Sequence, residues 1–96
     1  MLTEDKLFKL LSSDLRYRIV KTLAESDTEV RLKDLVASLH EYSQPVISIS
    51  IKELYISGLI TRIRSGQSVS YGINCKENVK ALLSTVTVCL EALKHP

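Results

Sequence analysis

The hydrophobic positions of the first forty residues predict three helices, over about residues 4–11, 14–25 and 31–40. In each segment apolar side chains recur three or four positions apart, which places them on one face of a helix. Thr3 and Ser13 precede the first two segments and can cap the helix N-termini with their hydroxyl groups. The polar stretch 26–30 predicts a turn before the third helix.

The stretch YSQPVISISIKELYISGLI, residues 42–60, predicts a fourth helix. Ser43 can cap its N-terminus, and Pro45 is tolerated in the first turn because the amide that it lacks would have no helical partner. Gly58 follows the apolar stripe, at a position where a left-handed residue commonly closes a helix. The stripe itself consists of Ile47, Ile51 and Leu54. Together, residues 31–60 have the pattern of a helix-turn-helix.

Two short alternating runs follow within residues 59–73, on either side of Ser65, Gly66 and Gln67, as in a two-stranded hairpin. Asn74 and Glu77 then have the spacing of a capping box, in which two side chains satisfy free amides at the start of a helix. A long helix is expected after them. Its apolar stripe consists of Val79, Leu82, Leu83, Val86, Leu90 and Leu93.

The predicted order is therefore four helices, two strands and a final helix. This mainly α fold with a small β-hairpin is that of a winged helix-turn-helix. The chain has neither a linker nor an internal repeat, so residues 1–96 are expected to form one domain.

The net charge of +2 is too small to indicate a nucleic-acid partner by itself. The charges are unevenly distributed, however, because residues 42–74 contain three basic residues and a single acid. These are Lys52, Arg62, Arg64 and Glu53. The helix-turn-helix and hairpin half of the chain is thus locally basic, as expected of a surface that binds DNA.

Five residues of the fourth helix lie at its tip or opposite its apolar stripe, where they can meet a major groove. They are Gln44, Pro45, Ser48, Ile49 and Lys52. Gln44 can pair with adenine, Ser48 with phosphate or a base edge, and Lys52 with phosphate, whereas Ile49 offers only apolar contact, for instance to a thymine methyl. The alternative is a solvated helix face of no special function.

Arg62 and Arg64 are two positions apart on one strand, so their side chains point to the same face. This placement suits a hairpin that lies along phosphates or a minor groove. The alternative is an edge strand that its charges protect from pairing. Arg16 and Arg18 of the second helix could also contact the DNA backbone, although a salt-bridged surface is at least as compatible with their positions.

The segments LFKLLSSDLRYRIVKTLAES and SQPVISISIKELYISGLITRIRSGQSVSYGIN resemble the ArsR/SmtB-type family of small dimeric winged-helix repressors, from about Leu7 to Leu93. The family pattern has S-Q-[PS]-x-V-S-x-H-L in the recognition helix. Here Ser50 stands in place of the usual His, and Ile49 stands where Arg or Gln is common. The resemblance implies a homodimer and DNA as partner.

The apolar surface of the terminal helices exceeds what one short domain is expected to cover, and the family's dimers use the same two helices. We therefore expect dimerisation through Leu7, Phe8, Leu11, Leu82, Leu83, Val86, Leu90 and Leu93.

The soft or imidazole metal ligands are few, and no two of them share a helix face at a spacing of three or four. They are His40, Cys75, Cys89 and His95. We therefore expect neither a metal site nor a cofactor. Cys89 is interpreted as a small buried apolar residue. Cys75, beside Lys76, could have an activated thiolate, but no second thiol lies near it in the sequence.

No catalytic set or phosphate-binding glycine loop occurs, so an enzyme is not expected. The N-terminal residues mix charges among apolar residues, unlike a signal peptide or membrane span, so we expect a cytoplasmic protein with no membrane contact. The sequence predicts a homodimeric, sequence-specific DNA-binding transcriptional regulator that represses without a metal. The alternative is a winged-helix module in which Ile49, Tyr55 and their apolar neighbours bind a protein.

Overall fold

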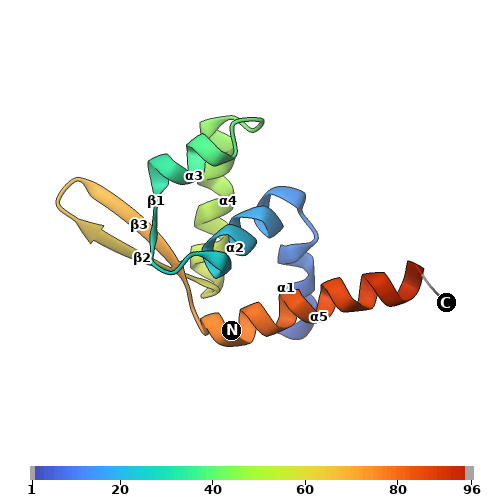
Figure 1. The fold of residues 1–96 in the computed structure, drawn as a ribbon. Helices are drawn as coiled ribbons and strands as arrows, with labels where there is room; N and C mark the ends of the chain where they lie inside the picture. The colour runs from blue at the N-terminus through green and yellow to red at the C-terminus, as the bar shows by residue number, and fades with distance from the viewer. Residues whose placement is uncertain (1, 95–96) are drawn as a thin grey trace.

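The structure is a computed structural model that describes residues 2–94. Five helices and three strands follow one another along the chain (Figure 1). In order, they are α1 (Glu4–Leu11), α2 (Asp14–Glu25), β1 (Val30–Arg31), α3 (Leu32–Ser38), α4 (Gln44–Ser57), β2 (Ile60–Ser65), β3 (Ser68–Ile73) and α5 (Lys76–Lys94). The predicted class, mainly helical with a small β-hairpin, is confirmed.

The predicted order lacked one element, the strand β1. Val30 pairs with Tyr71 and Arg31 with Ser70, so β3 lies between β1 and β2 in a three-stranded antiparallel sheet. The turn expected over residues 26–30 therefore ends one residue earlier than predicted. Two residues carry no period of their own, so this strand exists only because β3 presents a free edge to it.

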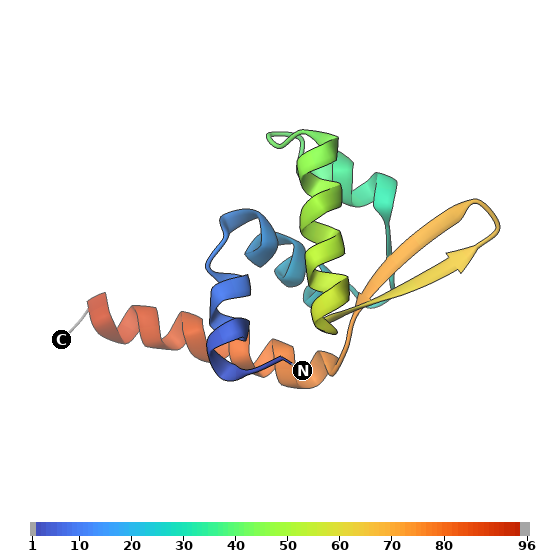
Figure 2. The ribbon, with the colours of Figure 1, turned by 180° about the vertical axis from the view of Figure 1, so that it is seen from behind.

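The core forms where α2 packs between the helix-turn-helix and the sheet. Ile19 and Val20 on α2 are fully buried, as are Ile47 and Leu54 on α4. Leu35 on α3 is fully buried in the same core. The hairpin and the C-terminal half of α5 project from this body in different directions (Figures 1 and 2).

The recognition-type helix α4 begins and ends where the sequence predicted. Ser43 occupies the N-cap position, although its hydroxyl makes no capping hydrogen bond, and Pro45 lies in the first turn. Gly58 has a φ of 89° in the left-handed region, and its amide donates to the carbonyl oxygen of Tyr55 at 3.1 Å. Glycine adopts this conformation without a steric cost at Cβ, so α4 stops there and β2 begins two residues later.

The capping box predicted at the start of α5 does not form. The side-chain amide of Asn74 instead donates to the carbonyl oxygen of Gly58 at 3.2 Å, and its backbone amide donates to Leu59 O at 3.0 Å. The first helical hydrogen bond runs from the Val79 amide to the Cys75 carbonyl oxygen, with Cys75 at a φ of 52°. Asn74 thus ties the end of the hairpin to the end of α4, and α5 begins one residue later than predicted.

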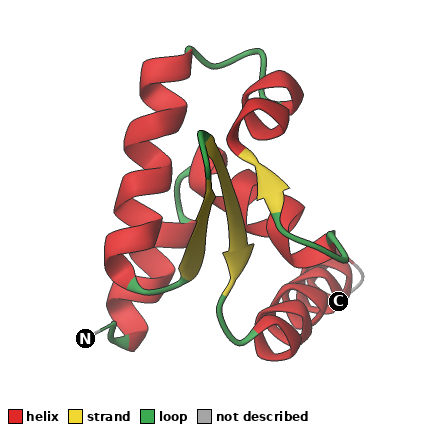
Figure 3. Cartoon of the chain, turned by 90° about the vertical axis from the view of Figure 1, so that its left-hand side faces the viewer, coloured by secondary structure: helices red, strands yellow, loops and turns green. Residues whose placement is uncertain are grey.

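The hairpin closes with a tighter turn than predicted. Ser65 pairs with Ser68, which leaves Gly66 and Gln67 as a two-residue turn. A positive φ of 61° at Gly66, the first central position, is typical of a type II′ turn, whose twist matches that of the flanking strands. Seen from the side, the hairpin lies between α4 and the β1–α3 segment (Figure 3). Across residues 2–94, no helix has the length and apolar character needed to cross a membrane.

The two faces of α4 should respond differently to truncation. Leu54→Ala removes a fully buried side chain and should lower the free energy of unfolding by about 2–5 kcal/mol. Ile56→Ala, two residues away, trims a side chain that is 72% exposed and should change it by less than about 0.5 kcal/mol. Urea unfolding followed by circular dichroism measures both values, and equal losses would contradict this orientation of α4.

Candidate nucleic-acid interface

The exposed face of α4 carries all five residues that the sequence assigned to DNA reading. The structure exposes every one of them, and they are Gln44, Pro45, Ser48, Ile49 and Lys52. Ile49 is 60% exposed, whereas Ser50 is only 6% exposed and faces the core. Of the two departures from the family pattern, only Ile49 therefore alters the outer face of the helix.

Arg62 and Arg64 lie on β2, opposite Tyr71 and Val69 of β3. Directly paired residues of an antiparallel sheet share a face, and so do residues two apart on one strand. The two guanidinium groups therefore belong to one face of the hairpin, as predicted, and both residues are exposed. Among residues 2–94, neither of them forms an ion pair, and nor does Lys52.

The arginines of α2 are engaged instead. Arg16 pairs with Glu53 of α4 at 3.0 Å and donates to the carbonyl oxygen of Leu10 at 2.8 Å. Arg18 pairs with Glu41 at 2.9 Å. The alternative interpretation of these two arginines, a salt-bridged surface, is thus the one that the structure shows. Glu53 is the one acid of α4, and its charge is offset by Arg16 of the neighbouring helix α2.

A second set of contacts holds the turn that precedes α4 against α2. The Tyr42 hydroxyl donates to Asp14 Oδ2 at 2.5 Å, and the Arg18 Cζ atom lies 5.9 Å from the centroid of the Tyr42 ring. The hydrogen bond from Arg18 favours the carboxylate of Glu41 and lowers its pKa. The bond to Asp14 favours the neutral phenol and raises the pKa of Tyr42.

The signs of these two shifts set the pH range over which the turn is held. Glu41 contributes stability that is present above the ordinary pKa of a glutamate and is lost as the pH falls through its lowered, folded-state pKa. Tyr42 contributes stability that is present below the ordinary pKa of a tyrosine and is lost as the pH rises through its raised pKa. At neutral pH, both contacts are intact.

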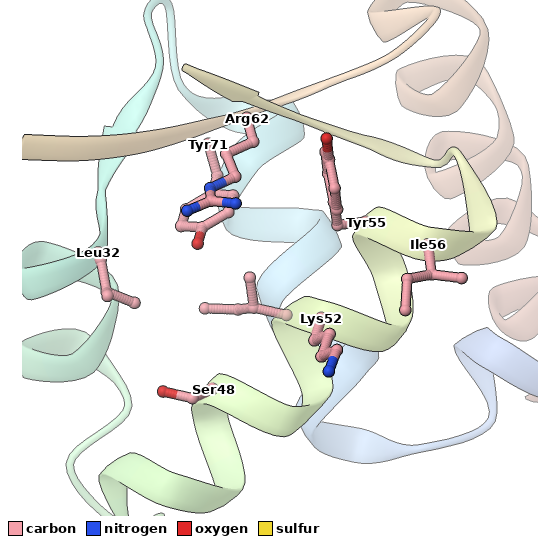
Figure 4. Close-up of a pocket in the computed structure, with 8 residues that line it drawn as sticks. Leu32, Ser48, Lys52, Tyr55, Ile56, Arg62 and Tyr71 are labelled. Carbon is pink, nitrogen blue, oxygen red and sulfur yellow. The ribbon is translucent and has the colours of Figure 1, made fainter. Parts of the chain in front are cut away.

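A groove of about 340 Å³ lies between α4 and the hairpin (Figure 4). Three of the residues assigned to DNA binding line it, namely Ser48 and Lys52 from α4 and Arg62 from β2. Gln44, at the start of α4, and Arg64, farther along β2, are not part of its wall. One basic residue of the helix, Lys52, and one of the hairpin, Arg62, therefore line the same groove, although they are 10 positions apart in the sequence.

Two further basic residues lie near the hairpin and were missed by the sequence interpretation, although Arg31 pairs with Ser70 and so belongs to the other face of the sheet from Arg62 and Arg64. The pairing of β1 with β3 brings Arg31 to the hairpin, and Arg31 and Lys33 line a smaller groove of about 220 Å³ with Gln67, Ser68 and Val69. Both residues are exposed. The signal in the sequence was the basic pair in RLK, but it could not be placed beside the hairpin without β1.

The residues assigned to dimerisation divide into two groups. Leu7, Leu11 and Leu82 are half-buried and line a small apolar groove between α1 and α5, and Leu83 packs against the core. Val86 is also half-buried. The remaining three are exposed in the single chain, namely Phe8, Leu90 and Leu93. The part of α5 that holds the last two extends beyond the body of the domain (Figure 2).

Both cysteines are exposed. The interpretation of Cys89 as a buried residue is therefore wrong for the single chain, because no other element within residues 2–94 covers this part of the projecting half of α5. Within the described range 2–94, no three His, Cys, Asp or Glu side chains are grouped so that they could hold a metal ion. His95 lies outside the described residues.

No protein-family model matches the chain. The chain is 30% identical over 86 residues to the putative arsenical resistance operon repressor ArsR2 of Halobacterium salinarum, an alignment that covers 90% of this chain and 70% of that protein. It is also similar to HlyU from Vibrio cholerae, with 29% identity, a TM-score of 0.71 and 83% coverage of each chain.

A third similar protein is the homodimeric winged helix-turn-helix DNA-binding domain of Mb0332 from Mycobacterium bovis, described as a possible ArsR-family transcriptional regulator. The identity is 21% and the TM-score is 0.74, over 94% of this chain and 81% of that one. At this identity the comparison shows a shared fold.

Proposed function

The chain belongs to the ArsR family of winged-helix transcriptional regulators, and we propose that it acts as a homodimeric repressor that recognises a specific sequence of double-stranded DNA. Residues 1–96 would form one winged-helix domain with dimerisation helices at both ends. The names of two relatives support this proposal, since ArsR2 is a putative operon repressor and the Mb0332 domain is homodimeric.

The observation that carries the proposal is the position of three unpaired cations on the outer face of α4 and on one face of the hairpin. Lys52, Arg62 and Arg64 are exposed without an acidic partner in the described chain, whereas Arg16 and Arg18 of α2 are engaged in ion pairs. Free cations on one surface attract phosphates, and binding them releases condensed counterions. In our proposal α4 enters the major groove and the hairpin follows the backbone.

Replacing the two arginines of the hairpin tests this arrangement. Arg62→Ala combined with Arg64→Ala should weaken binding to all duplexes alike and reduce the slope of log K against log salt by about one to two contacts. Fluorescence anisotropy at several salt concentrations measures the slope. The matched control is Lys21→Ala with Lys80→Ala, which removes two cations from the α2–α5 surface and should leave the slope unchanged.

If the hairpin variant showed the same slope of log K against log salt as the unmodified protein, the two arginines would not contact phosphates and the hairpin would have only a structural role. If the unmodified protein bound no duplex at all, the proposal would fail in favour of the protein-interaction alternative. That alternative draws on the exposed apolar side chains Ile49, Tyr55 and Ile56. Apolar contacts with a protein partner would not produce a steep salt dependence.

We expect Ile49 to contact the methyl group of a thymine in the bound DNA. It is the exposed apolar residue between Ser48 and the buried Ser50, and its only complement on base edges is the 5-methyl group of thymine. Replacing the contacted thymine of a selected site by deoxyuridine removes one methyl group, worth about 0.8 kcal/mol, and should weaken binding about three- to fourfold. Ile49→Ala should abolish this difference, while Ser48→Ala should retain it. Equal affinity of the unmodified protein for both duplexes at every thymine would remove Ile49 from base reading.

The dimer is best tested with residues that do not support the monomer fold. Leu90 and Leu93 are 54% and 71% exposed, whereas Leu83 packs against the core of its own chain. Leu90→Glu with Leu93→Glu should therefore yield folded monomers that bind DNA far more weakly, because each half-site loses the linked second contact. Analytical ultracentrifugation measures the oligomeric state.

Val88→Glu is the matched control, since Val88 lies on the other side of α5 and should leave the dimer intact. A twofold dimer would place its two recognition helices about 34 Å apart, so the preferred site should be an imperfect palindrome. A monomeric unmodified protein at micromolar concentration would contradict the dimer.

A further inference from the structure

We propose that the groove between α4 and the hairpin binds a small organic anion, a carboxylate on an aromatic or branched apolar body, and that this ligand excludes DNA. The existence of this binding site is inferred from the geometry of the groove. The exclusion of DNA rests on the function proposed above. The volume of about 340 Å³ is within the range of small-molecule sites, which begins at roughly 300 Å³.

The walls of the groove are mostly apolar. Ile51 and Tyr71 are buried at its floor, Leu32 is half-buried at one side, and Tyr55 and Ile56 form part of the rim. An exposed apolar rim beside an apolar floor loses contact with water when an apolar body enters, which favours binding. A phosphodiester has no apolar body of this kind, so DNA alone does not account for these walls.

The charges at the mouth of the groove are all positive. Lys52 of α4 and Arg62 of β2 line it, and no Asp or Glu among residues 2–94 does (Figure 4). Glu53, the neighbour of Lys52, pairs with Arg16 on the other side of the helix. A carboxylate in the groove would therefore meet two cations, with the Ser48 hydroxyl as a further donor.

A second groove of the molecule provides the contrast. It has about 290 Å³ between α2 and α5 and is lined by Lys21 and Lys80, but Glu25 lines it as well. The acid offsets part of the positive charge, so this groove lacks the unbalanced pair of cations. Similar size and the same number of cations make it an internal control for non-specific attraction of anions.

Occupancy would affect DNA binding directly. The ligand would take Lys52 and Arg62, which the proposed DNA complex also needs, and its body would lie between the recognition helix and the hairpin. Two ligands that compete for the same groups weaken each other reciprocally. At a ligand concentration ten times its Kd, the apparent Kd for DNA should rise about tenfold. The ligand would thus relieve repression.

The first experiment needs no DNA. The ¹⁵N-labelled full chain is titrated with 2-naphthoate and, separately, with the uncharged 2-naphthalenemethanol. We expect naphthoate to bind at least about tenfold more tightly than the alcohol, with the largest amide shifts in α4 and β2, since a charge-assisted hydrogen bond is worth about a factor of ten or more. Lys52→Gln with Arg62→Gln should remove this preference for the anion.

Matched variants keep the result interpretable if a substitution perturbs the fold. Lys21→Gln with Lys80→Gln removes the same charge from the second groove and should leave naphthoate binding unchanged. Ile56→Asn should weaken binding of both naphthyl compounds, whereas Val88→Asn, at a residue of similar exposure on α5, should weaken neither. Equal affinity for acid and alcohol, or largest shifts in α5, would overturn the site.

The second experiment adds a DNA duplex, selected for binding to this protein, to the same titration. Naphthoate, but not the alcohol, should displace it from the protein in proportion to occupancy of the groove. Naphthoate binding with unchanged DNA affinity would overturn the exclusion. If no duplex bound under any condition while naphthoate still bound in the groove, the function proposed above would fail and the ligand site would stand.

Discussion

The burial of one face of α4 against α2 is the constraint on which the rest of this structure depends. Ile47, Ile51 and Leu54 are removed from water by contact with a helix whose own Ile19 and Val20 are fully buried. Because α4 has a fixed period, burying this stripe determines which residues face outward. The outward face, the position of the hairpin after Gly58 and the groove between them all follow from it.

Ion pairs engage the two arginines of α2, whereas the basic residues of α4 and β2 form no ion pair within the described residues. The arginines of α2 hold α4 and the turn before it, through Glu53 and Glu41. Exposed pairs of this kind contribute little stability, but they engage the acids Glu41 and Glu53, which lie next to the proposed DNA-binding residues. Lys52 and Arg62 are left without acids, at the place where helix and hairpin meet. A net charge near zero thus conceals a surface that is locally basic.

The small size of the domain explains its apolar surface. A chain of 96 residues buries proportionally little of its surface, and α5 extends past the body that could cover it. Apolar side chains are consequently exposed in two places, on the projecting half of α5 and on the rim of the groove beside α4. The first suits a second copy of the chain, whereas the second is bordered by cations and suits an amphiphilic ligand.

The sequence by itself determined the helices, the hairpin and the outer face of α4, because periodicity and the glycine at position 58 act over a few residues. It did not determine β1, since two residues form a strand only when a distant edge receives them. For the same reason it did not place Arg31 at the hairpin. The capping box failed because the Asn74 amide found a partner at Gly58, 16 residues away, that local spacing cannot reveal. Tertiary structure also decided the pairing of Arg16 and Arg18, the exposure of Cys89 and the groove itself, since each depends on which side chains approach from other elements.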